Sequence, residues 1–440
     1  MDGTPQHLQV AGAQHMPCQW TSWGRAGDGL ELSNMQTNTP GKTSNGIQVV
    51  SSRAPSAAEA VAELTRALTG DNQPAPGFIP AASAFAHFLV FYSADYAASA
   101  LAAELNAAFP SVLVSGCSTA GEIAPNGMSD GGVVLIAFCA AHFRVHAGLI
   151  EGVGSFAVER AAEVVRRLQS KLRLDGVESA GKKVFAIMLV DGLSNAEEMV
   201  VAAVHWAVDD VQLIGGSAGD QLAFTQTSLI HDSCVVHNAA VLIMVATDLP
   251  FRVFKTQNFE PTAVKLVVTA ADAEKRIVYE LNAEPAAREY ASAIGLMPDD
   301  LGPFSFASHP LVVKVGGDYY CRSIRNMNAD GSLTFFCAID EGLVFTVAEP
   351  QDMLRSTAKT LDDVSAELGG TEMILGFDCI LRRLDAENRQ IRHEVEEIYR
   401  RHRVTGFHTY GEQFNAMHLN QTLTGIAFGR SPRPPEEDGA

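Results

Sequence analysis

From about residue 46 the chain alternates short apolar stretches with longer amphipathic ones. The apolar stretch at 86–93 has the length and the aromatic and β-branched content of a buried strand. The segments at 96–109, 155–172 and 196–208 place apolar residues at helical spacing. Strands that alternate with helices of about ten to fifteen residues predict an α/β sheet covered by helices.

After about residue 225 the pattern changes to successive strands, among them 234–246 and 264–270. A helix is predicted near Glu284, further strands from 304 to 347, helices near 350–367 and 385–402, and a glycine-punctuated, strand-like segment at 406–429. The predicted fold class is therefore α/β to α+β, in two lobes that each contain a mainly β sheet covered by helices.

The two ends of the chain lack this periodicity. Residues 1–45 are rich in Gly, Gln, Asn, Thr and Ser, and the last residues combine prolines with a charge cluster. We expect a flexible leader at 1–45, an N-terminal domain at 46–255, a C-terminal domain at 256–430 and a disordered tail at 431–440.

Composition narrows the functional classes. Lys and Arg number 32 against 51 Asp and Glu, so the 440-residue chain carries a formal charge of -19 and repels polyphosphates and anionic lipid headgroups. We therefore expect no nucleic-acid binding. Seven cysteines without a C-x-x-C pair indicate reduced thiols in the cytoplasm. The N-terminus lacks the features of a secretory signal, and the apolar run at 239–246 is far shorter than the ~20 residues that span a bilayer, so neither export nor a membrane span is expected.

Two loops of the first lobe look alike, at 112–122 (VLVSGCSTAGE) and 211–220 (VQLIGGSAGD). In each, an apolar strand runs into glycines and hydroxyl side chains and ends in a carboxylate. Glycine allows close approach of the backbone, which leaves amides and hydroxyls free to face a ligand. Two self-satisfied turns explain the same residues, and an internal duplication explains their likeness. The ligand-binding candidates in these loops are Gly116, Ser118, Thr119, Glu122, Ser217 and Asp220.

The second lobe holds a denser set of polar residues. Arginine supplies a planar fork for carboxylates and phosphates, while Asp, Glu, Asn and Tyr orient amines or hydroxyls. Such a set suits a small zwitterionic or anionic ligand, and the alternative is internal pairing that closes the lobe. The candidates are Arg322, Asp340, Glu341, Arg382, Tyr410, Glu412 and Asn420.

An enzyme is the rival interpretation. Residues 215–219 match G-x-S-x-G, the motif that positions the nucleophilic serine of many hydrolases, here Ser217. That motif requires a helix directly after the serine, whereas this sequence soon enters a strand. Cys117 is the thiol candidate, but no histidine can be placed beside it, and a small buried thiol is the alternative. The sequence carries no P-loop, Rossmann or zinc-protease motif.

Thirteen histidines are scattered along the chain. His231 and His237 flank a polar turn before a very apolar strand. A lone imidazole beside an aliphatic wall is what an axial haem ligand needs, so these two residues are the candidate haem-iron ligands. The alternative at each position is a strand-end or surface histidine without a ligand.

Several motifs in a fixed order resemble the FIST family: GCSTAGE, then GGSAGD, then NAEPAAREYA, and finally GFHTYGE with NQT. The resemblance covers roughly residues 46–430 and implies a FIST N domain followed by a FIST C domain. It also implies a non-catalytic, intracellular sensor of bacterial signal transduction that binds a small ligand such as an amino acid or a derivative.

Within that family, the stand-alone NosP-like members bind haem, sense nitric oxide and regulate a histidine kinase. Two stretches, SLTFFCAIDEGLVFTVAE and GFDCILRRL, are similar to this subset. The resemblance thus implies haem as a cofactor and a histidine kinase as the partner, although no family motif fixes the haem ligand. The alternatives are a sensor of an amino-acid-like metabolite or a hydrolase that uses Ser217 or Cys117. The F-box branch of the family is not supported, because residues 1–45 lack a leucine-rich helical pattern.

Overall fold

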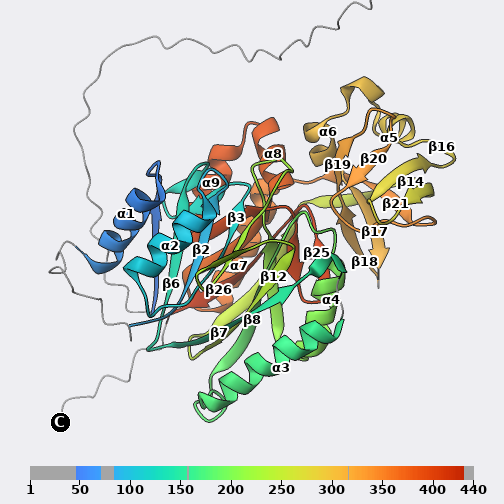
Figure 1. Ribbon diagram of the computed structural model, residues 1–440. Coiled ribbons are helices and arrows are strands. Elements are labelled where there is room, and N and C mark those ends of the chain that lie inside the picture. Colours follow the sequence, from blue (N-terminus) through green and yellow to red (C-terminus); the bar gives the residue numbers. More distant parts are fainter. Residues whose placement is uncertain (1–45, 71–83, 156–157, 316, 431–440) are drawn as a thin grey trace, which may run out of the picture. The chain divides into compact units, whose positions relative to one another are not determined.

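The computed structural model describes residues 46–70, 84–155, 158–315 and 317–430 (Figure 1). The predicted leader at 1–45 and tail at 431–440 lie outside these residues. The mixed α/β class is confirmed, because helices flank several β-sheets. Among the helices described, none combines the length and the apolar character needed to cross a membrane.

Three stretches of the chain build sheets of the same design, which we call modules 1, 2 and 3. Module 1 contains β1 (Ile47–Ser52), α1 (Ala57–Thr69), β2 (Phe85–Ser93), α2 (Ala98–Ala108), β3 (Val114–Thr119), β4 (Glu122–Ala124), β5 (Gly127–Ser129) and β6 (Val133–Cys139). Module 2 contains β7 (Phe143–Glu151), α3 (Val158–Leu174), β8 (Lys183–Val190), α4 (Glu197–Val208), β9 (Gln212–Ser217), β10 (Leu229–His231), β11 (Cys234–Val236) and β12 (Ala239–Thr247). Module 3 contains β13 (Phe251–Gln257), α7 (Met353–Glu367), β22 (Thr371–Cys379), α8 (Ile380–Asn388), α9 (Arg392–Arg401), β23 (Val404–Thr409), β24 (Glu412–Phe414), β25 (Met417–Leu419) and β26 (Thr422–Gly429).

The strand order is the same in each module. The first, last, second and third long strands lie side by side, as β1-β6-β2-β3, β7-β12-β8-β9 and β13-β26-β22-β23. The second and third strands are parallel, and their other neighbours are antiparallel. Parallel neighbours need a crossover connection, which α2, α4 and the pair α8 and α9 provide.

Each module gives its short hairpin to the sheet of another module. The hairpin β4–β5 of module 1 pairs with β23, β10–β11 of module 2 pairs with β3, and β24–β25 of module 3 pairs with β9. The exchange closes a cycle among the three sheets. No module therefore completes its own sheet.

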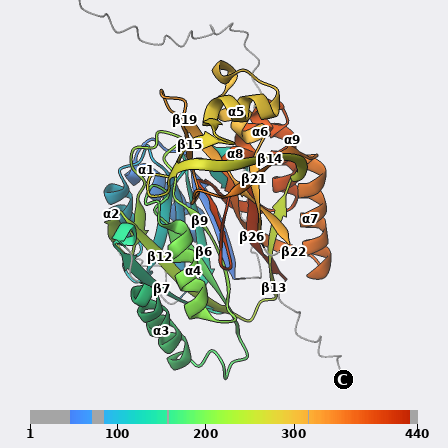
Figure 2. The same ribbon diagram turned by 90° about the vertical axis from the view of Figure 1, so that its right-hand side faces the viewer.

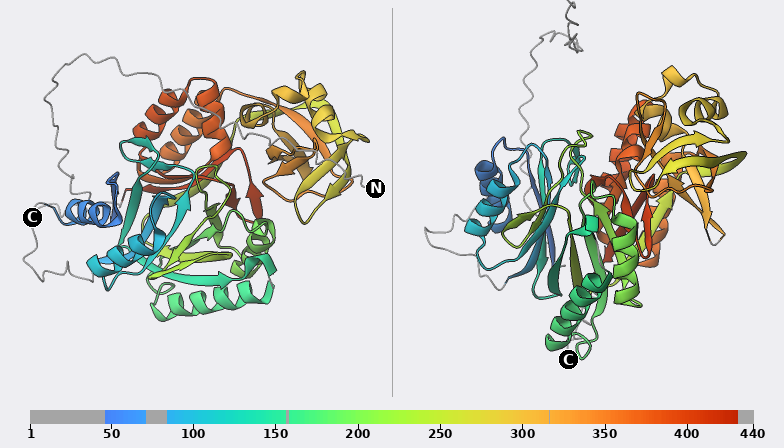
Figure 3. Two further views of the ribbon diagram at one scale, coloured as in Figure 1. Left: turned by 45° about the horizontal axis from the view of Figure 1, so that its top comes forward. Right: turned by 45° about the vertical axis from the view of Figure 1, so that its right-hand side comes forward.

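A separate lobe is inserted into module 3 between β13 and α7, and Figures 2 and 3 show it at one end of the three sheets. It contains β14 (Phe259–Asp272), β15 (Ile277–Leu281), β16 (Glu284–Pro285), α5 (Ala286–Ile294), α6 (Pro303–Ser308), β17 (Leu311–Val315), β18 (Asp318–Arg322), β19 (Ile324–Met327), β20 (Leu333–Phe335) and β21 (Val344–Pro350). Its own core packs around Tyr290, Phe335 and Phe345.

The inner faces of the three sheets share one apolar core. Phe91 of module 1 packs against Phe377 and Phe407 of module 3, and the core extends to Ile187 and Val241 of module 2. Helices cover the outer faces, so the central strands are buried on both sides and read as continuous apolar runs. β12 is buried along its whole length.

Local signals fix several helix ends. Ser56 caps α1 by accepting from Glu59 N, and Asp352 caps α7 by accepting from Arg355 N. The prediction of strands from residue 304 is wrong at its start, because Pro303 occupies the first turn of α6, where its missing N–H costs nothing.

The sheets do not divide at the boundary expected between the N-terminal and C-terminal domains. The expected boundary between residues 255 and 256 falls inside β13, and the later strands β24 and β25 complete the sheet of module 2. The inserted lobe splits the third copy of the repeat, which hides it from a reading of local patterns.

Candidate functional site

Three equivalent loops meet where the modules join. Each one follows the third long strand of its module, at 119–122, 217–220 and 409–412. The first and third lead directly into the exchanged hairpin, whereas the second continues through 221–228 before β10. Backbone hydrogen bonds link the loops in a ring, from Ala120 N to His408 O (3.0 Å), from Gly219 N to Ser118 O (3.0 Å) and from Tyr410 N to Ser217 O (3.2 Å). The two loops that look alike in the sequence are thus two of three copies.

Two carboxylates of the loop ring, Glu122 and Glu412, accept hydrogen bonds from their own modules. Glu122 accepts hydrogen bonds from Thr119 (2.7 Å) and from the N–H of Gly132 (2.9 Å), and Glu412 accepts from the hydroxyls of Thr409 (2.5 Å) and Thr422 (2.6 Å). Burial raises the pKa of Glu122 to about 7 and that of Glu412 to about 8, although these hydrogen bonds oppose the shift. With their acceptor sites taken, both residues act as internal braces in this structure.

The third carboxylate, Asp220, stabilises the loop that follows it rather than a hairpin. It accepts from the backbone N–H groups of residues 224 (2.9 Å), 225 (2.7 Å) and 226 (2.9 Å) and from the hydroxyl of Tyr410 (2.5 Å). Burial opposes ionisation, but these hydrogen bonds lower the pKa of Asp220. They hold a loop, 220–227, in which Gln221, Leu222 and Phe224 all have positive φ (56°, 68° and 51°). Such backbone strain gathers at functional sites.

Loop 220–227 touches the inserted lobe through aromatic rings. The ring of Phe224 lies 5.8 Å from that of Phe336 in the lobe and 5.0 Å from that of Tyr410 in the loop ring. The guanidinium of Arg325, also in the lobe, lies 5.5 Å from the centre of the Phe224 ring.

An ion-pair clamp lies at the same junction. Arg276 of the lobe donates to Glu197 (2.7 Å) and Glu198 (2.6 Å), the first two residues of α4, and to the backbone oxygen of Phe336. Glu198 also accepts from Ala338 N (2.6 Å). Burial raises the pKa of Glu197 to about 7 against the opposing charge of Arg276. The clamp therefore joins α4 of module 2 to the lobe through a buried pair.

Four buried polar atoms at the junction have no hydrogen-bond partner within the described chain: Ser323 Oγ, Gln413 Oε1, His418 Nε2 and Asn420 Oδ1. Gln413, His418 and Asn420 lie close together around Gly411, and Ser323 follows Arg322, whose charge acts on His418. Gln413 donates to Ser217 Oγ (2.9 Å) and lies 3.4 Å from His418 Nδ1, and Asn420 donates to Tyr410 O (3.4 Å). Buried polar groups in folded proteins are nearly always paired with protein groups or with water, so these atoms require a partner that water or a ligand can supply.

The protonation state of His418 follows from its surroundings. Burial, together with the charges of Arg276 and Arg322, lowers the pKa of His418 to about 4 against the pull of Glu198, so the ring is neutral at neutral pH. Since Gln413 is placed to donate to Nδ1, we assign the proton to Nε2. The junction then offers one free donor, at His418, two free acceptors, at Gln413 and Asn420, and the hydroxyl of Ser323.

The junction also holds two positive charges, those of Arg322 and Arg325. Arg322 and Arg325 are half-buried, and among the described residues no carboxylate lies within 4.0 Å of either guanidinium; Arg322 donates to its neighbour's carbonyl and Arg325 to Asn326. Burial lowers the pKa of Arg325, and the adjacent Arg276 adds to the effect. We call the set Arg322, Ser323, Arg325, Gln413, His418 and Asn420 the junction site.

The structure brings only some of the predicted site residues together. Asp220, Arg322, Tyr410 and Asn420 lie at or beside the junction site. Arg382 is fully buried and binds Asp378 (2.8 Å), Asn258 (2.7 Å) and Thr357 (2.9 Å), so it closes module 3 internally, as one of the alternatives held. Asp340 and Glu341 are exposed and bond only to nearby backbone.

The predicted residues of the first loop have structural partners. Ser118 accepts from Ser228 N (3.0 Å), and Thr119 donates to Glu122. Gly116 lies so close to β2 that a Cβ would stand 2.2 Å from Val90 O. These contacts stabilise the pairing of β3 with its neighbours.

The two candidate nucleophiles lack the setting that catalysis requires. Ser217 accepts from Gln413, and β9 is followed by a loop and β10 rather than by a helix. Cys117 is fully buried, and burial raises the pKa of its thiol well above the usual value.

The haem candidates supply one feature of an axial ligand. His237 Nδ1 lies 2.7 Å from Thr227 O, as in many metal-binding histidines, but its Nε2 lies 3.5 Å from Gln226 Nε2. The side chain is exposed, however, and its neighbours Gln226 and Thr227 are polar, so the two apolar walls of a haem pocket are not provided there. His231 is half-buried beside Asp232. The residues around either histidine do not fit a haem.

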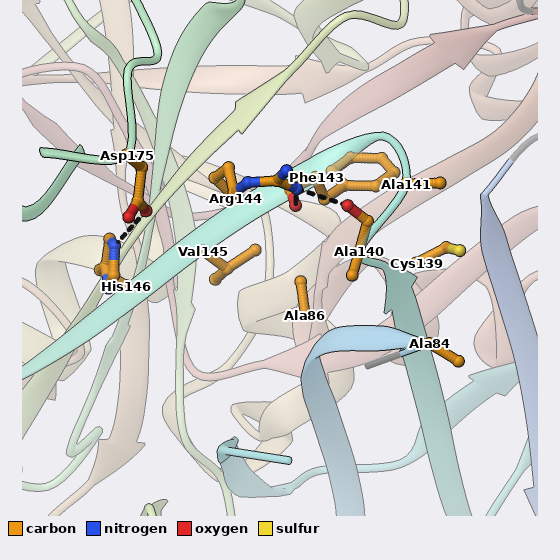
Figure 4. A pocket seen from close by; sticks show the side chains of 10 residues that line it. All are labelled: Ala84, Ala86, Cys139, Ala140, Ala141, Phe143, Arg144, Val145, His146 and Asp175. Atoms are coloured by element: carbon orange, nitrogen blue, oxygen red, sulfur yellow. Dashed lines mark hydrogen bonds and ion pairs between the residues drawn. The ribbon is translucent and has the colours of Figure 1, made fainter. Parts of the chain in front are cut away.

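A pocket of about 600 Å³ lies elsewhere, along β7 and the start of β2 (Figure 4). Its polar side chains are already engaged: His146 pairs with Asp175 (2.7 Å), and Arg144 donates to the carbonyls of Ala140 and Phe143. Ala84, which also lines it, directly follows residues 71–83, which lie outside the described residues.

Several junction residues were missed in the sequence. Glu197 and Glu198 begin a helix, which is a common place for acidic residues and gave no functional signal. Their partner Arg276 lies far away in the sequence. Phe224 and Gln413 carry no motif at all.

The fold and site define a class of protein: fused α/β modules that meet at a polar, cation-rich junction with an inserted lobe. Family models agree with this class. The FIST N domain matches residues 86–284 and the FIST C domain matches 286–415, together about three quarters of the chain. The chain belongs to the FIST family, as the motifs implied. FIST domains are generally sensory domains of signal transduction that bind small ligands and signal to partners.

One curated relative is the uncharacterized protein MJ1623 of Methanocaldococcus jannaschii. It is 24% identical over a 254-residue alignment, and the match covers 50% of this chain and 49% of that protein. The matched region thus spans about half the length of the relative. The boundary between the two family domains, near residue 285, falls inside the inserted lobe between β16 and α5 rather than between modules.

Proposed function

We propose that this protein is a cytoplasmic small-ligand sensor whose ligand binds at the junction site and changes how the chain contacts a signalling partner. The observation that carries the proposal is a set of four buried polar atoms and two guanidinium groups that, among residues 46–430 as far as the structure describes them, have neither hydrogen-bond nor carboxylate partners respectively. A ligand that satisfied these groups would remove the cost of leaving them unpaired.

The ligand we propose is a small anion or zwitterion. A carboxylate or phosphate group pairs with the forks of Arg322 and Arg325, while an ammonium or hydroxyl group donates to Gln413 Oε1 and Asn420 Oδ1. Phe224, Phe336 and Tyr410 supply apolar contact beside these polar groups. An amino-acid-like metabolite has this combination of groups.

Thermal unfolding with a panel of amino acids, dicarboxylates and small phosphates tests the proposal. A ligand that binds only the folded state raises the melting temperature. We expect at least one compound to stabilise the wild type and to lose most of that effect in Arg322→Ala. Arg355→Ala, an exposed arginine of α7, is the matched control and should behave as the wild type. If no compound stabilises the wild type, or if both variants respond alike, the proposal fails.

The partner we propose is a histidine kinase or another signalling protein. Ligand control requires that the ligand bind two conformations of the sensor with different affinity. The strained loop 220–227 and the Arg276 clamp both lie beside the junction site, so a ligand that alters either one also alters how the lobe sits on α4.

Haem-based nitric oxide sensing is the narrower alternative. Its one favourable observation is the contact from His237 Nδ1 to Thr227 O. The absorbance spectrum of the purified, haem-reconstituted protein tests it: a Soret band that moves with nitric oxide and is lost in His237→Ala supports haem, and a colourless protein refutes it.

A further inference from the structure

Two large apolar side chains are exposed on the outer face of α4. Trp206 is 83% exposed and Met199 is 46% exposed. They lie seven residues apart, which places both on the same side of the helix, with Ala202 between them. An exposed tryptophan with an apolar neighbour is typical of the anchor residues of protein–protein interfaces.

The neighbouring helix α3 adds positive charge. Arg166, Arg167, Lys171 and Arg173 are all exposed, and the helix contains no Asp or Glu after Glu163. In the described part of the chain none of the four has a carboxylate within ion-pair distance, 4.0 Å. The whole chain carries a charge of -19, so this cluster stands out against an acidic background.

The two helices present one surface. α3 and α4 pack against each other and against the outer face of the module 2 sheet through Val165, Leu168, Val200 and Val204 (Figures 1 and 2). Trp206 and Met199 of α4 face away from that core, as do the α3 cations. Helical spacing places Arg166 and Arg173 on the flank of α3 toward α4, whereas Arg167 and Lys171 lie on the other flank, near His231.

We infer that this α3–α4 surface docks an acidic amphipathic helix of a partner protein. Helices have satisfied main-chain groups, so a partner cannot extend a sheet here and must be recognised by its side chains. An apolar face covers Trp206 and Met199, and a rim of Asp or Glu pairs with the α3 cations at short range. Arginine and tryptophan at the centre are what strong interfaces favour.

This surface is distinct from the junction site. α4 begins with Glu197 and Glu198 at the clamp, and Trp206 lies near its other end. Loss of ligand binding and loss of docking can therefore be told apart by Arg322→Ala in the lobe and Trp206→Ala near the end of α4.

Fluorescence anisotropy with labelled peptides tests the inference on the full chain. The probe is a helical peptide with leucines at i, i+3, i+4 and i+7, flanked by glutamates, and the comparison peptide replaces every glutamate by lysine. We expect the acidic peptide to bind and the lysine peptide not to bind. Trp206→Ala and the double variant Arg166→Glu/Arg173→Glu should each weaken binding at least about tenfold, with binding falling as salt rises.

Matched variants keep the result interpretable. Met297→Ala removes an exposed apolar side chain of the lobe, and Arg355→Glu/Arg401→Glu makes the same charge change on α7 and α9; both should bind the peptide as the wild type does. Circular dichroism checks that every variant is folded. The inference is overturned if the acidic peptide does not bind, if the control variants lose binding equally, or if vesicles with anionic lipid bind this surface in place of the peptide.

Discussion

At the scale of single residues, the same chemistry serves two purposes in the loop ring. Glu122 and Glu412 are buried carboxylates whose acceptor sites are filled by their own hairpins, whereas Asp220 holds a strained loop against the lobe. The difference lies in the chain that follows: tight hairpins after Glu122 and Glu412, and a longer loop after Asp220. The copy that departs from the repeat is the one beside the unpaired polar atoms.

The raised pKa of Glu412 predicts a pH dependence of stability. Its folded value of about 8 exceeds the ordinary value of 4.5, so between these values the unfolded chain binds fewer protons than the folded one. Stability therefore falls as pH rises through this window, by an amount on the order of a few kcal/mol.

Urea unfolding at pH 5, 6, 7 and 8 checks this expectation, with Glu412→Gln as the comparison. The fall should be smaller in Glu412→Gln, whose amide does not titrate. Buried His418 acts in the opposite sense, because its lowered pKa destabilises the fold as pH falls from about 6.5 to about 4, and this contribution is common to both proteins. Equal slopes for the two proteins would refute the role of Glu412.

At the scale of elements, α4 connects the lobe to the body of the molecule. Its first turn receives Arg276, and its far end carries the exposed Trp206. A buried ion pair fixes the position of the two elements that it joins, because a charge that loses its partner in the interior costs free energy.

Arg276→Ala tests the clamp. The substitution leaves Glu197 buried without its counter-charge, so we expect a loss of about 3–5 kcal/mol in the free energy of unfolding, measured by urea denaturation. Adding Glu197→Gln should restore part of that loss. Lys275→Ala, the exposed neighbour that pairs with Asp272, should change stability little. A near-neutral Arg276→Ala would contradict the clamp.

Parts of this arrangement were readable from the sequence. The alternation of strands and helices predicted the fold class, and the likeness of 112–122 and 211–220 pointed to a repeat. The third loop was not recognised as a copy because Phe407, His408 and Tyr410 replace small residues there, filling the shared core and holding loop 220–227. Arg382 and Asp378, four residues apart, were locally readable as a pair. The bond from Arg276 to Glu197 was not, since only the folded chain brings them together.

At the scale of the whole molecule, the exchanged hairpins make the three modules depend on one another. The sheet of module 2 ends in β24 and β25, which come from the last part of the chain. β4 of module 1 pairs with β23 of module 3 and with β5 of its own hairpin. Contacts of such sequence separation form late and are lost together.

A fragment of residues 40–247 tests this interdependence. It contains modules 1 and 2 but lacks β23 and the hairpin β24–β25, so two sheet edges and a large part of the shared core are uncovered. We expect the fragment to show no cooperative thermal transition by circular dichroism, whereas the full chain does. A soluble fragment with a sharp transition would contradict the exchange as a source of stability.

Hydrogen exchange with and without a stabilising metabolite tests the central claim most directly, because it reports where on the chain the ligand acts. The account predicts new protection in peptides that cover 220–227, 320–326 and 411–420, and the loss of that protection in Arg322→Ala. Protection confined to the pocket along β7, or spread evenly over the chain, would contradict a ligand site at the junction.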